Sequence, residues 1–536
     1  MNPVPVLIVG AGPVGLTMAT HLHHHGIQCR IVDKNPVPTD KSKALALWAR
    51  SLEMLDNVGI TQPFIDAGQL LNSARLHAGT KLLTTITFDP QGTRHPKPLM
   101  IPQCDTERLL AEHLQRQGIH IERGVELLDL TDHGDHVSAI LHHPDGHDES
   151  VNFDWLVGCD GAHSIVRKKI GMEFTGEAEP NDWVLADCRV EGVSTDDLSA
   201  FWHTKGVVVF FPFGQGRCRL IADMGLAKNQ GRPADPTLAE VQAIAHERGL
   251  TNVKLSDPHW LAGFRIHERK VAEYRHGRVF LAGDAAHIHS PAGGQGMNTG
   301  MQDAFNLAWK LALVQSGRAK PSLLDSYGRE RSEVGDLVLK QAGRMTRMVT
   351  LRNPILRFIR NRVVGIVTRI PSIRRNMVRY LSELSIHYPH SPLNGESGGW
   401  SKGGICPGDR IPDIELRSTP TGEQEWLQHA VRGPKYNLLL IANDVDSPTL
   451  QSLNELQQQL HATYLDRVNV HLILPTTATD DRFASVLIDP TQQIRKSFGA
   501  RGNALALVRP DGYLAYRCQP ATWTALREYL DRYWIA

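Results

Sequence analysis

The chain has 536 residues, too many for one ordinary hydrophobic core, so two or three domains are expected. The formal net charge of +1 gives no field for steering nucleic acid or any other strongly charged partner. The seven cysteines form no CxxC pair, which favours a reducing cytoplasm and argues against disulfides or a thiolate zinc site. The apolar start, residues 4–9, runs straight into a glycine motif and is interpreted as a first strand rather than a signal peptide.

Residues 6–33 predict a strand, a glycine turn, a helix and a second strand. Gly10, Gly12 and Gly15 have the GxGxxG spacing, in which Gly12 lets the backbone approach a pyrophosphate. The second strand ends at Asp33, whose carboxylate can accept hydrogen bonds from ribose hydroxyls. The pattern predicts a dinucleotide site, against the alternative of a glycine-rich turn in a plain βαβ unit. It does not distinguish FAD from NAD.

Residues 75–100 and 183–268 are expected to form a sheet that covers the cofactor, because polar and apolar residues alternate there. Trp202, Phe211 and Phe213 could wall an aromatic pocket, although ordinary core packing explains them equally well. No cluster of Arg or Lys announces a substrate carboxylate. A neutral ligand is therefore favoured over a carboxylate.

Two further segments favour FAD. In residues 154–167 an apolar strand ends at Asp160, and a helix is expected to start near Ser164. In residues 277–298 a buried strand delivers Asp284 at its tip, and a glycine-rich loop from Pro291 to Asn298 precedes a long amphipathic helix. The loop amides and the helix start would face the pyrimidine edge of an isoalloxazine, where reduced flavin is negatively charged.

The three segments, in this order, resemble the single-component FAD-dependent aromatic hydroxylases, which include p-hydroxybenzoate, phenol, pentachlorophenol and polyketide aromatic hydroxylases. The resemblance implies FAD as the cofactor and NADPH or NADH as a transient electron donor. It also implies that reduced FAD captures O2 as a C4a-hydroperoxide, whose distal oxygen goes to a phenolic, quinol or polycyclic aromatic substrate. Two alternatives stay open, namely a flavin-linked reductase of the same fold and a non-catalytic flavin or quinone redox sensor.

The same resemblance implies an α/β fold in which a Rossmann-like FAD-binding domain is interleaved with a β-sheet substrate domain. The FAD-binding domain would comprise residues 1–74, 101–182 and 269–343, and the substrate-binding domain residues 75–100 and 183–268. A helical linker, 344–400, would lead to a thioredoxin-like α/β domain, 401–536. That domain has no CxxC, so a structural or dimer-forming part is expected, in a monomer or homodimer.

Carried over by position, the resemblance gives a set of cofactor-binding residues. The set is Gly10, Gly12, Pro13, Gly15, Asp33, Lys34, Lys43, Arg50, Gln103, Asp160, Gly283, Asp284, Pro291, Gly294, Gly296, Met297 and Asn298. Lys43 stands where many relatives have an arginine, so it keeps the charge and loses the two-pronged geometry. The candidate substrate pocket is Trp202, Phe211, Phe213, Pro291 and Ala292.

No side chain is a clear acid–base catalyst. Phenol hydroxylases carry an aspartate in the region of residues 44–47, which is wholly apolar here. His203 and His289 are weak candidates, and a plain polar function explains each of them better. His287 and His289 form HxH, but no third ligand lies nearby in the sequence, so no metal is expected. The histidines at 21 and 23–25 end a predicted helix and are expected to be solvated.

The stretch from Arg344 to Arg379 carries ten arginines and no acid, interleaved with apolar residues. Such a basic amphipathic segment can lie on an anionic membrane. The alternative is a helical hairpin docked on the body of the protein, and the sequence favours that alternative.

Overall fold

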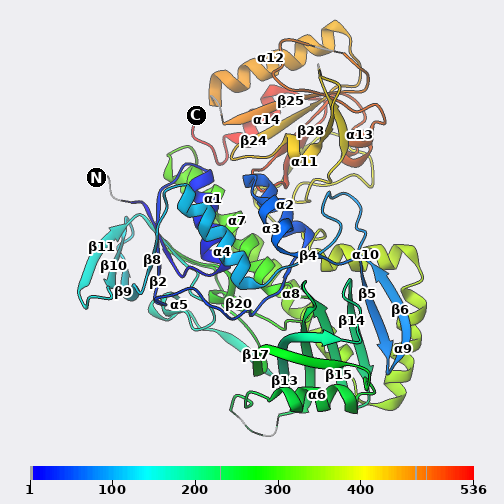
Figure 1. The fold of residues 1–536 in the computed structure, drawn as a ribbon. Coiled ribbons are helices and arrows are strands. Elements are labelled where there is room, and N and C mark those ends of the chain that lie inside the picture. The colour runs from blue at the N-terminus through cyan, green and yellow to red at the C-terminus, as the bar shows by residue number, and fades with distance from the viewer. Residues whose placement is uncertain (1–3, 228, 230, 420, 465–466, 479) are drawn as a thin grey trace.

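The computed structural model describes the whole chain apart from residues 1–3, 228, 230, 420, 465–466 and 479. It contains two α/β units with a third, mostly antiparallel sheet beside the first of them (Figure 1). The FAD-binding unit has a six-stranded sheet in the order β18 (Arg275–His276), β19 (Val279–Leu281), β12 (Trp155–Gly158), β1 (Val6–Val9), β2 (Cys29–Asp33) and β8 (Ile121–Arg123). All neighbouring strands are parallel except β18 and β19.

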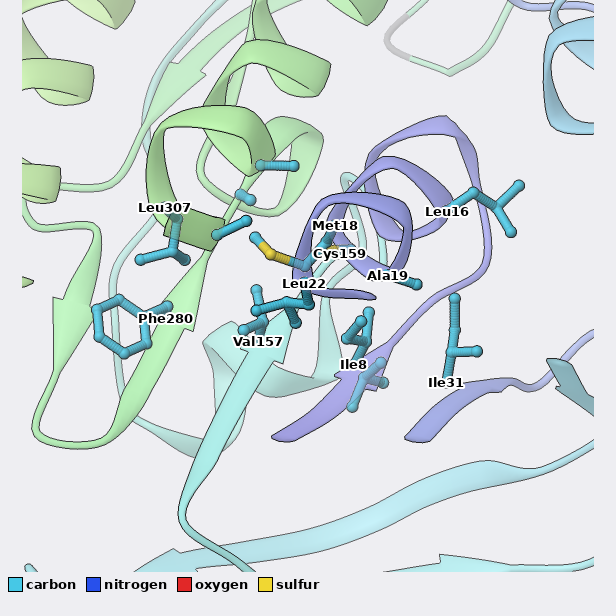
Figure 2. Packing of buried hydrophobic residues seen from close by; sticks show 14 of the residues in the cluster. Ile8, Leu16, Met18, Ala19, Leu22, Ile31, Val157, Cys159, Phe280 and Leu307 are labelled. Atoms are coloured by element: carbon cyan, nitrogen blue, oxygen red, sulfur yellow. The ribbon is translucent and has the colours of Figure 1, made fainter. Parts of the chain in front are cut away.

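Helix α1 (Pro13–His24) packs on this sheet between α4 (Gln103–Arg116) and α7 (Gly296–Gln315). Figure 2 shows Ile8 and Val157 of the strands meeting Leu22 of α1, with Leu307 of α7 close by. Parallel strands covered by helices are apolar along their whole length, which explains why the segment before Gly10 is uniformly hydrophobic. A small antiparallel sheet of β9 (Glu126–Asp132), β10 (Val137–His142) and β11 (Asp148–Phe153) adds its apolar residues to the same core.

The substrate-side sheet has eight strands. Their order is β20 (His287–Ile288), β17 (Lys254–Lys270), β13 (Thr175–Glu191), β16 (Arg217–Leu226), β15 (Gly206–Pro212), β14 (Asp197–His203), β5 (Ser73–Ala78) and β6 (Lys81–Thr87). Side chains alternate between its faces. Phe201 and Phe210 pack under α6 (Leu238–Glu247), whereas Trp202 and Phe211 lie on the opposite face.

The C-terminal unit is an eight-stranded mixed sheet. Its order is β21 (Gly395–Ser397), β28 (Leu514–Cys518), β27 (Ala504–Val508), β24 (Tyr436–Ile441), β25 (Val468–Leu474), β26 (Val486–Ile488), β22 (Glu415–Ser418) and β23 (Gln424–Trp426). One face packs against α12 (Ser447–Tyr464) and α14 (Trp523–Leu530), and the other against α11 (Leu427–Ala430) and α13 (Gln493–Phe498). Because β21 pairs with β28, this sheet begins before residue 401.

Short elements connect the units. They are α2 (Ala49–Val58), α3 (Thr61–Ala67), α5 (Ile165–Lys169) and the small sheet of β3 (Ala46–Leu47), β7 (Leu99–Met100) and β4 (Gln69–Leu70). Single turns of 3₁₀ helix, Gly283–Ala285 and Pro321–Leu324, precede α7 and α8 (Asp325–Val349). After α8 come α9 (Pro354–Val367) and α10 (Pro371–Leu381). Within the described residues, every helix is too short or too polar to cross a lipid bilayer.

Two sequence expectations need correction. Helix α7 already begins at Gly296, so the glycine-rich loop ends at Gln295 rather than at Asn298. His21 is buried, not solvated, because it falls on the face of α1 that packs against α7, where its ring lies 4.5 Å from that of Phe305. Burial lowers the pKa of His21 well below its usual value, so the ring is neutral.

Candidate active site

The turn between β1 and α1 contains three glycines with different surroundings. A Cβ on Gly10 would lie 2.5 Å from the carbonyl oxygen of Cys159, and its φ of +104° suits only glycine. A Cβ on Gly15 would lie 1.9 Å from the carbonyl oxygen of Gly10. A Cβ on Gly12 would meet nothing within 4 Å. The protein itself therefore requires Gly10 and Gly15, whereas Gly12 leaves space at the start of α1, where an anion could bind.

Asp33 lies at the tip of β2 and faces this turn. Its carboxylate accepts a hydrogen bond from the Ala11 N–H at 2.8 Å and another from the Asn35 N–H at 2.8 Å. Arg123, its register partner on β8, lies 3.8 Å away. Lys34 is exposed next to it. The arrangement is a fixed carboxylate at the edge of the nucleotide turn.

Gln103 and Glu107 lie on the first turn of α4 beside this carboxylate. The Gln103 side chain accepts from the Ala44 N–H at 3.1 Å and donates to Glu107 at 2.8 Å. Burial raises the pKa of Glu107, and Asp33 raises it further, whereas Arg123 and Lys43 lower it. Glu107 and Arg123 were not singled out from the sequence, because neither lies in a glycine motif.

Asp160 follows β12 and caps α5. One of its oxygens accepts from the Ile165 N–H at 2.6 Å. The other oxygen, Oδ1, is buried without a hydrogen-bond partner in the part of the chain that the structure describes. Desolvation raises the pKa of this carboxyl. A buried acceptor left unpaired is costly, so a ligand that donates to it would be stabilised.

Asp284 follows β19 on the same edge of the sheet. Its side chain is accessible to solvent, yet desolvation by the surrounding protein raises its pKa, and Lys43 acts in the opposite direction. Both observations fit a carboxyl at the floor of a recess, within electrostatic reach of a lysine. Gly283 precedes it with a φ of +60° and donates its N–H to Asp303 at 2.9 Å.

The loop from Pro291 to Gln295 is held from outside by Trp48. The Trp48 indole donates to the Gly293 carbonyl oxygen at 2.9 Å, and its backbone N–H donates to Asn298 Oδ1 at 2.9 Å. The Asn298 amide in turn donates to the carbonyl oxygens of Ala46 and Gly294, at 2.8 and 3.0 Å. Asn298 is therefore a brace between the loop and β3. The N–H groups of the first turn of α7 have no partner within the helix and are available to an anion.

Beneath the loop lies a buried charged network centred on Asp303 of α7. Its carboxylate accepts from the Gly283 N–H, from His287 Nε2 at 2.8 Å and from Arg331 at 2.6 Å. His289 lies two residues after His287. Its Nε2 is buried and, among the described residues, has no hydrogen-bond partner. Its ring lies 3.7 Å from the Cβ position of Gly296, and desolvation lowers its pKa to about 4. His289 is therefore a neutral imidazole next to the start of α7.

Glu383 holds the first turn of α7 from the other side. It accepts from the Thr299 hydroxyl at 3.0 Å and from the Gln302 amide at 2.6 Å. It is buried, has a φ of +60°, and desolvation raises its pKa to about 8. No motif in the sequence pointed to this residue, because it follows α10, some eighty residues after the helix that it contacts.

Comparison with known proteins identifies this arrangement. Residues 3–342 match the family described as FAD binding domain. The chain is 36% identical to 6-methylpretetramide 4-monooxygenase from Streptomyces rimosus, over 98% of this chain and 93% of that protein. It is 31% identical to pentachlorophenol 4-monooxygenase from Sphingobium chlorophenolicum, over 96% and 93% of the two chains. The chain belongs to the single-component FAD-dependent aromatic hydroxylases.

Solved structures agree with this assignment. The anhydrotetracycline hydroxylase OxyS from Streptomyces rimosus is 29% identical, with a TM-score of 0.77 over 98% of both chains. CabE, an aromatic hydroxylase from angucycline biosynthesis, is 30% identical, with a TM-score of 0.78 over 99% of both. The cofactor of the hydroxylase is FAD. The residues present fit it, because Gly12 leaves open space, Asp160 has an unpaired buried oxygen, and the Asp284 side chain is exposed at the end of β19.

Most of the predicted cofactor residues of the hydroxylase converge on one edge of the first sheet. Arg50 does not follow this pattern. Its guanidinium pairs with Glu53 at 3.2 Å, donates to the Asp511 carbonyl oxygen and lies 5.0 Å from the Tyr513 ring centre. The Arg50 guanidinium is therefore bound to its own helix α2 and to the C-terminal unit.

The aromatic candidates separate into two groups. Phe211 and Phe213 belong to a cluster with Trp48, Phe88 and Met100, the cluster that adjoins the glycine-rich loop. Trp202 lies in a different cluster, under α9. His203 ends β14 at a hairpin, where its ring contacts the Lys205 N–H at 3.3 Å, and Phe211 is at the other end of the neighbouring strand. The position of His203 gives it no part in the site.

One buried pair was missed from the sequence. Arg219 forms two hydrogen bonds of 2.7 Å with Asp187 on the sheet face that looks toward the loop, and it also donates to the carbonyl oxygens of Ser42 and Lys43. Its charge is therefore already balanced by protein groups. The pair ties the substrate-side sheet to the segment that carries Lys43.

Proposed function

We propose that the hydroxylase adds one oxygen atom of O2 to a neutral polycyclic phenol or quinol, with NADPH or NADH as the transient reductant. The observation that carries this proposal is the apolar cluster of Phe211, Phe213, Trp48 and Met100 beside the glycine-rich loop. The nearby Arg219 is neutralised by Asp187, which disfavours an anionic substrate such as a benzoate. The names of two relatives, with pretetramide and anhydrotetracycline as substrates, also point to a polycyclic aromatic substrate.

FAD, when bound, supplies the redox and oxygen chemistry, and the protein supplies position and dryness. In our proposal Gly10, Gly12, Pro13 and Gly15 hold the pyrophosphate on α1. Asp33 holds the adenosine ribose and Asp284 the ribityl chain, with Lys43 and Gln103 beside them. The loop and first turn of α7 hold the pyrimidine edge, through Pro291, Ala292, Gly294, Gly296, Met297 and Asn298.

Among the described residues, His289 Nε2 and His287 Nδ1 are both buried without a hydrogen-bond partner. Of the two, His289 is the one whose ring adjoins the start of α7, at 3.7 Å from the Cβ position of Gly296. Because its pKa is lowered to about 4, the ring is neutral at physiological pH. Its Nδ1 donates to the Ser290 carbonyl oxygen at 2.8 Å, so the unpaired Nε2 can accept one hydrogen bond. We assign it to contact with FAD or substrate rather than to general-base catalysis. The domain from residue 401 is proposed to be thioredoxin-like in fold. Its function is proposed to be structural, since all cysteines in the described chain are free and form no redox pair.

The experiment is O2 uptake with NADPH or NADH, in the presence of neutral polycyclic phenols or of benzoates. Neutral ligands should accelerate NAD(P)H oxidation and yield a product heavier by one oxygen. Phe213→Arg should remove this stimulation by placing an unpaired charge in the apolar wall, whereas Met224→Arg, at an exposed position, should not. Substrate turnover without O2 uptake would indicate the flavin-linked reductase. Absence of turnover with every ligand would indicate the redox sensor.

A further inference from the structure

Helix α9 exposes apolar side chains on its outer face, where a surface helix normally has polar ones. Ile355, Phe358 and Ile366 point outward and are 69%, 61% and 61% exposed, and Ile359 and Val363 fill the positions between them. This spacing of three and four residues forms one continuous apolar stripe along the helix. Figure 1 shows α9 at the margin of the molecule, beyond β5 and β6. A continuous exposed apolar stripe of five side chains marks an interaction surface.

The inner face of the same helix is docked on the sheet and includes one buried arginine. Arg360 is 8% exposed, lies 4.2 Å from the Trp202 ring centre and donates to the Met348 carbonyl oxygen at 2.9 Å. Val364 packs into the cluster of Trp183 and Trp202, and the hydroxyl of Thr368 bonds that of Thr84 on β6 at 2.9 Å. The orientation of α9 is therefore fixed by specific contacts. Its apolar face is outward because the inner face is already docked on the sheet.

The charge around the stripe has a single sign. Residues 337–382 contain eleven Lys and Arg and no Asp or Glu. Arg362, Arg369 and Arg375 are exposed on or beside α9, whereas the exposed Arg352 pairs with Asp223 at 3.4 Å. The apolar exposure continues through Ile370 and Ile373 into the start of α10. A two-fold contact between copies of this chain would oppose these cations to one another, which disfavours a homodimer through this face.

We propose that the outer face of α9 and the start of α10 dock on the surface of an anionic lipid bilayer. The helix lies in the plane of the interface, the apolar stripe enters the boundary between headgroups and acyl chains, and the flanking arginines contact lipid phosphates. This docking does not depend on the hydroxylation reaction. Its geometric consequence is that α10, whose Val378 and Leu381 pack in the cluster of Phe211 and Trp48, runs from the membrane face to the proposed substrate pocket.

The test uses the full chain loaded with FAD and two kinds of vesicle, phosphatidylcholine alone and phosphatidylcholine with phosphatidylglycerol. Binding in a sedimentation assay should be at least about tenfold stronger to the anionic vesicles and should weaken as salt is raised. Phe358→Glu with Ile366→Glu should reduce binding by about tenfold or more. The control is Leu128→Glu with Ile140→Glu, two apolar residues of similar type exposed on the small sheet, which should bind as wild type.

A second variant reads insertion directly. The wild-type chain already has ten tryptophans, so the signal is the difference in emission between Phe358→Trp and wild type. This difference emission should shift to the blue on anionic vesicles and be quenched by brominated acyl chains. NAD(P)H oxidation with a water-soluble phenol reports the proposed reaction separately and should be the same in all these variants. The proposal is overturned if wild type ignores anionic vesicles or if the glutamate variants bind equally well. It is also overturned if wild type is a dimer that the glutamate variants dissociate, because the face then joins two copies.

Discussion

At the scale of single residues, Gly12 and Gly15 separate what the fold requires from what the cofactor requires. Both belong to one motif and lie three residues apart. The Cβ position of Gly15 overlaps the backbone of Gly10, whereas that of Gly12 is open. A side chain at Gly15 therefore damages the protein, and a side chain at Gly12 meets only what binds there.

We expect Gly12→Val to abolish FAD retention while leaving the free energy of unfolding of the apoprotein within about 1 kcal/mol of wild type, because an extended N-cap residue tolerates valine. Gly15→Val should instead cost about 3 kcal/mol or more, because the backbone of Gly10 cannot move aside. FAD titration of the apoprotein and urea unfolding measure the two effects. Wild-type FAD affinity in Gly12→Val would show that the pyrophosphate does not bind at this turn.

The buried carboxyl of Glu383 should make the free energy of unfolding depend on pH. Its pKa is raised from 4.5 to about 8, so the folded state holds a proton that the unfolded chain releases above pH 4.5. Its contribution to stability is complete below pH 4.5 and is lost as pH rises toward 8. Glu383→Gln, which cannot ionise, should gain roughly 3–5 kcal/mol relative to wild type between pH 5 and pH 8. Urea unfolding across this range is the measurement, and Glu333→Gln, at an exposed position, is the control. Parallel curves for wild type and Glu383→Gln would show that Glu383 is ionised throughout.

At the scale of elements, the start of α7 decides how the flavin edge is placed. Gly296 has no positive φ, and its Cβ position makes only ordinary contact with the His289 ring at 3.7 Å. Alanine there suits the helix at least as well as glycine. Any functional loss in Gly296→Ala must therefore come from a bound molecule rather than from the fold.

We expect Gly296→Ala to keep its thermal stability but to lose coupling, with product per NAD(P)H falling about twofold or more and hydrogen peroxide rising in proportion. The reason is that a methyl group at the helix start displaces the flavin edge from the substrate. Gly328→Ala on α8, where a Cβ would meet nothing within 4 Å, is the matched control. Peroxide and product are measured together with NAD(P)H consumption. Full coupling in Gly296→Ala would show that the flavin edge does not lie against the start of α7.

The elements of the nucleotide site could be predicted because their signals are local. Strand β1, helix α1 and strand β2 follow from adjacent apolar runs and glycines, and Ser164 caps α5 through a bond to the Arg167 N–H, as expected. The brace of the loop could not be predicted, because Trp48 reaches Gly293 across 245 residues. The end of the loop was misjudged for a related reason. Gly296 is a poor helix former by propensity, and tertiary packing of α7 overrides it.

At the scale of the whole molecule, a buried charged cluster joins the FAD-binding and C-terminal units. Arg509 pairs with Glu330 at 2.7 Å and with Asp511 at 2.5 Å, and Lys310 pairs with Glu330 at 2.8 Å. All four side chains are almost fully buried. Such a cluster adds little net stability when complete, but removal of one member leaves an unpaired buried charge.

We expect Arg509→Leu to lower the free energy of unfolding by about 3–5 kcal/mol, because the buried Glu330 then keeps only Lys310 as an ion-pair partner among the described residues. Asp511 keeps hydrogen bonds from Trp309 and Asn306 but loses its ion pair with Arg509. The exposed Arg432→Leu should change it by less than about 0.5 kcal/mol. Thermal unfolding followed by flavin fluorescence and by circular dichroism would show whether the loss affects both units together. An Arg509→Leu protein as stable as wild type would mean that the units are held by apolar contacts alone.

The order of strands in the first sheet has a consequence for synthesis on the ribosome. Strand β1 pairs with β12 and β2, but β12 needs β19, and the Trp48 brace needs Gly293. At about 5–20 residues per second, the 245 residues between Trp48 and Gly293 take roughly 12–50 s to translate. During that interval the nascent glycine turn exists without the loop that would cover the flavin. FAD is therefore expected to be captured only after α7, which ends at Gln315 of 536 residues, has left the exit tunnel. A shortage of riboflavin would then expose chains longer than 315 residues to proteolysis rather than only short ones.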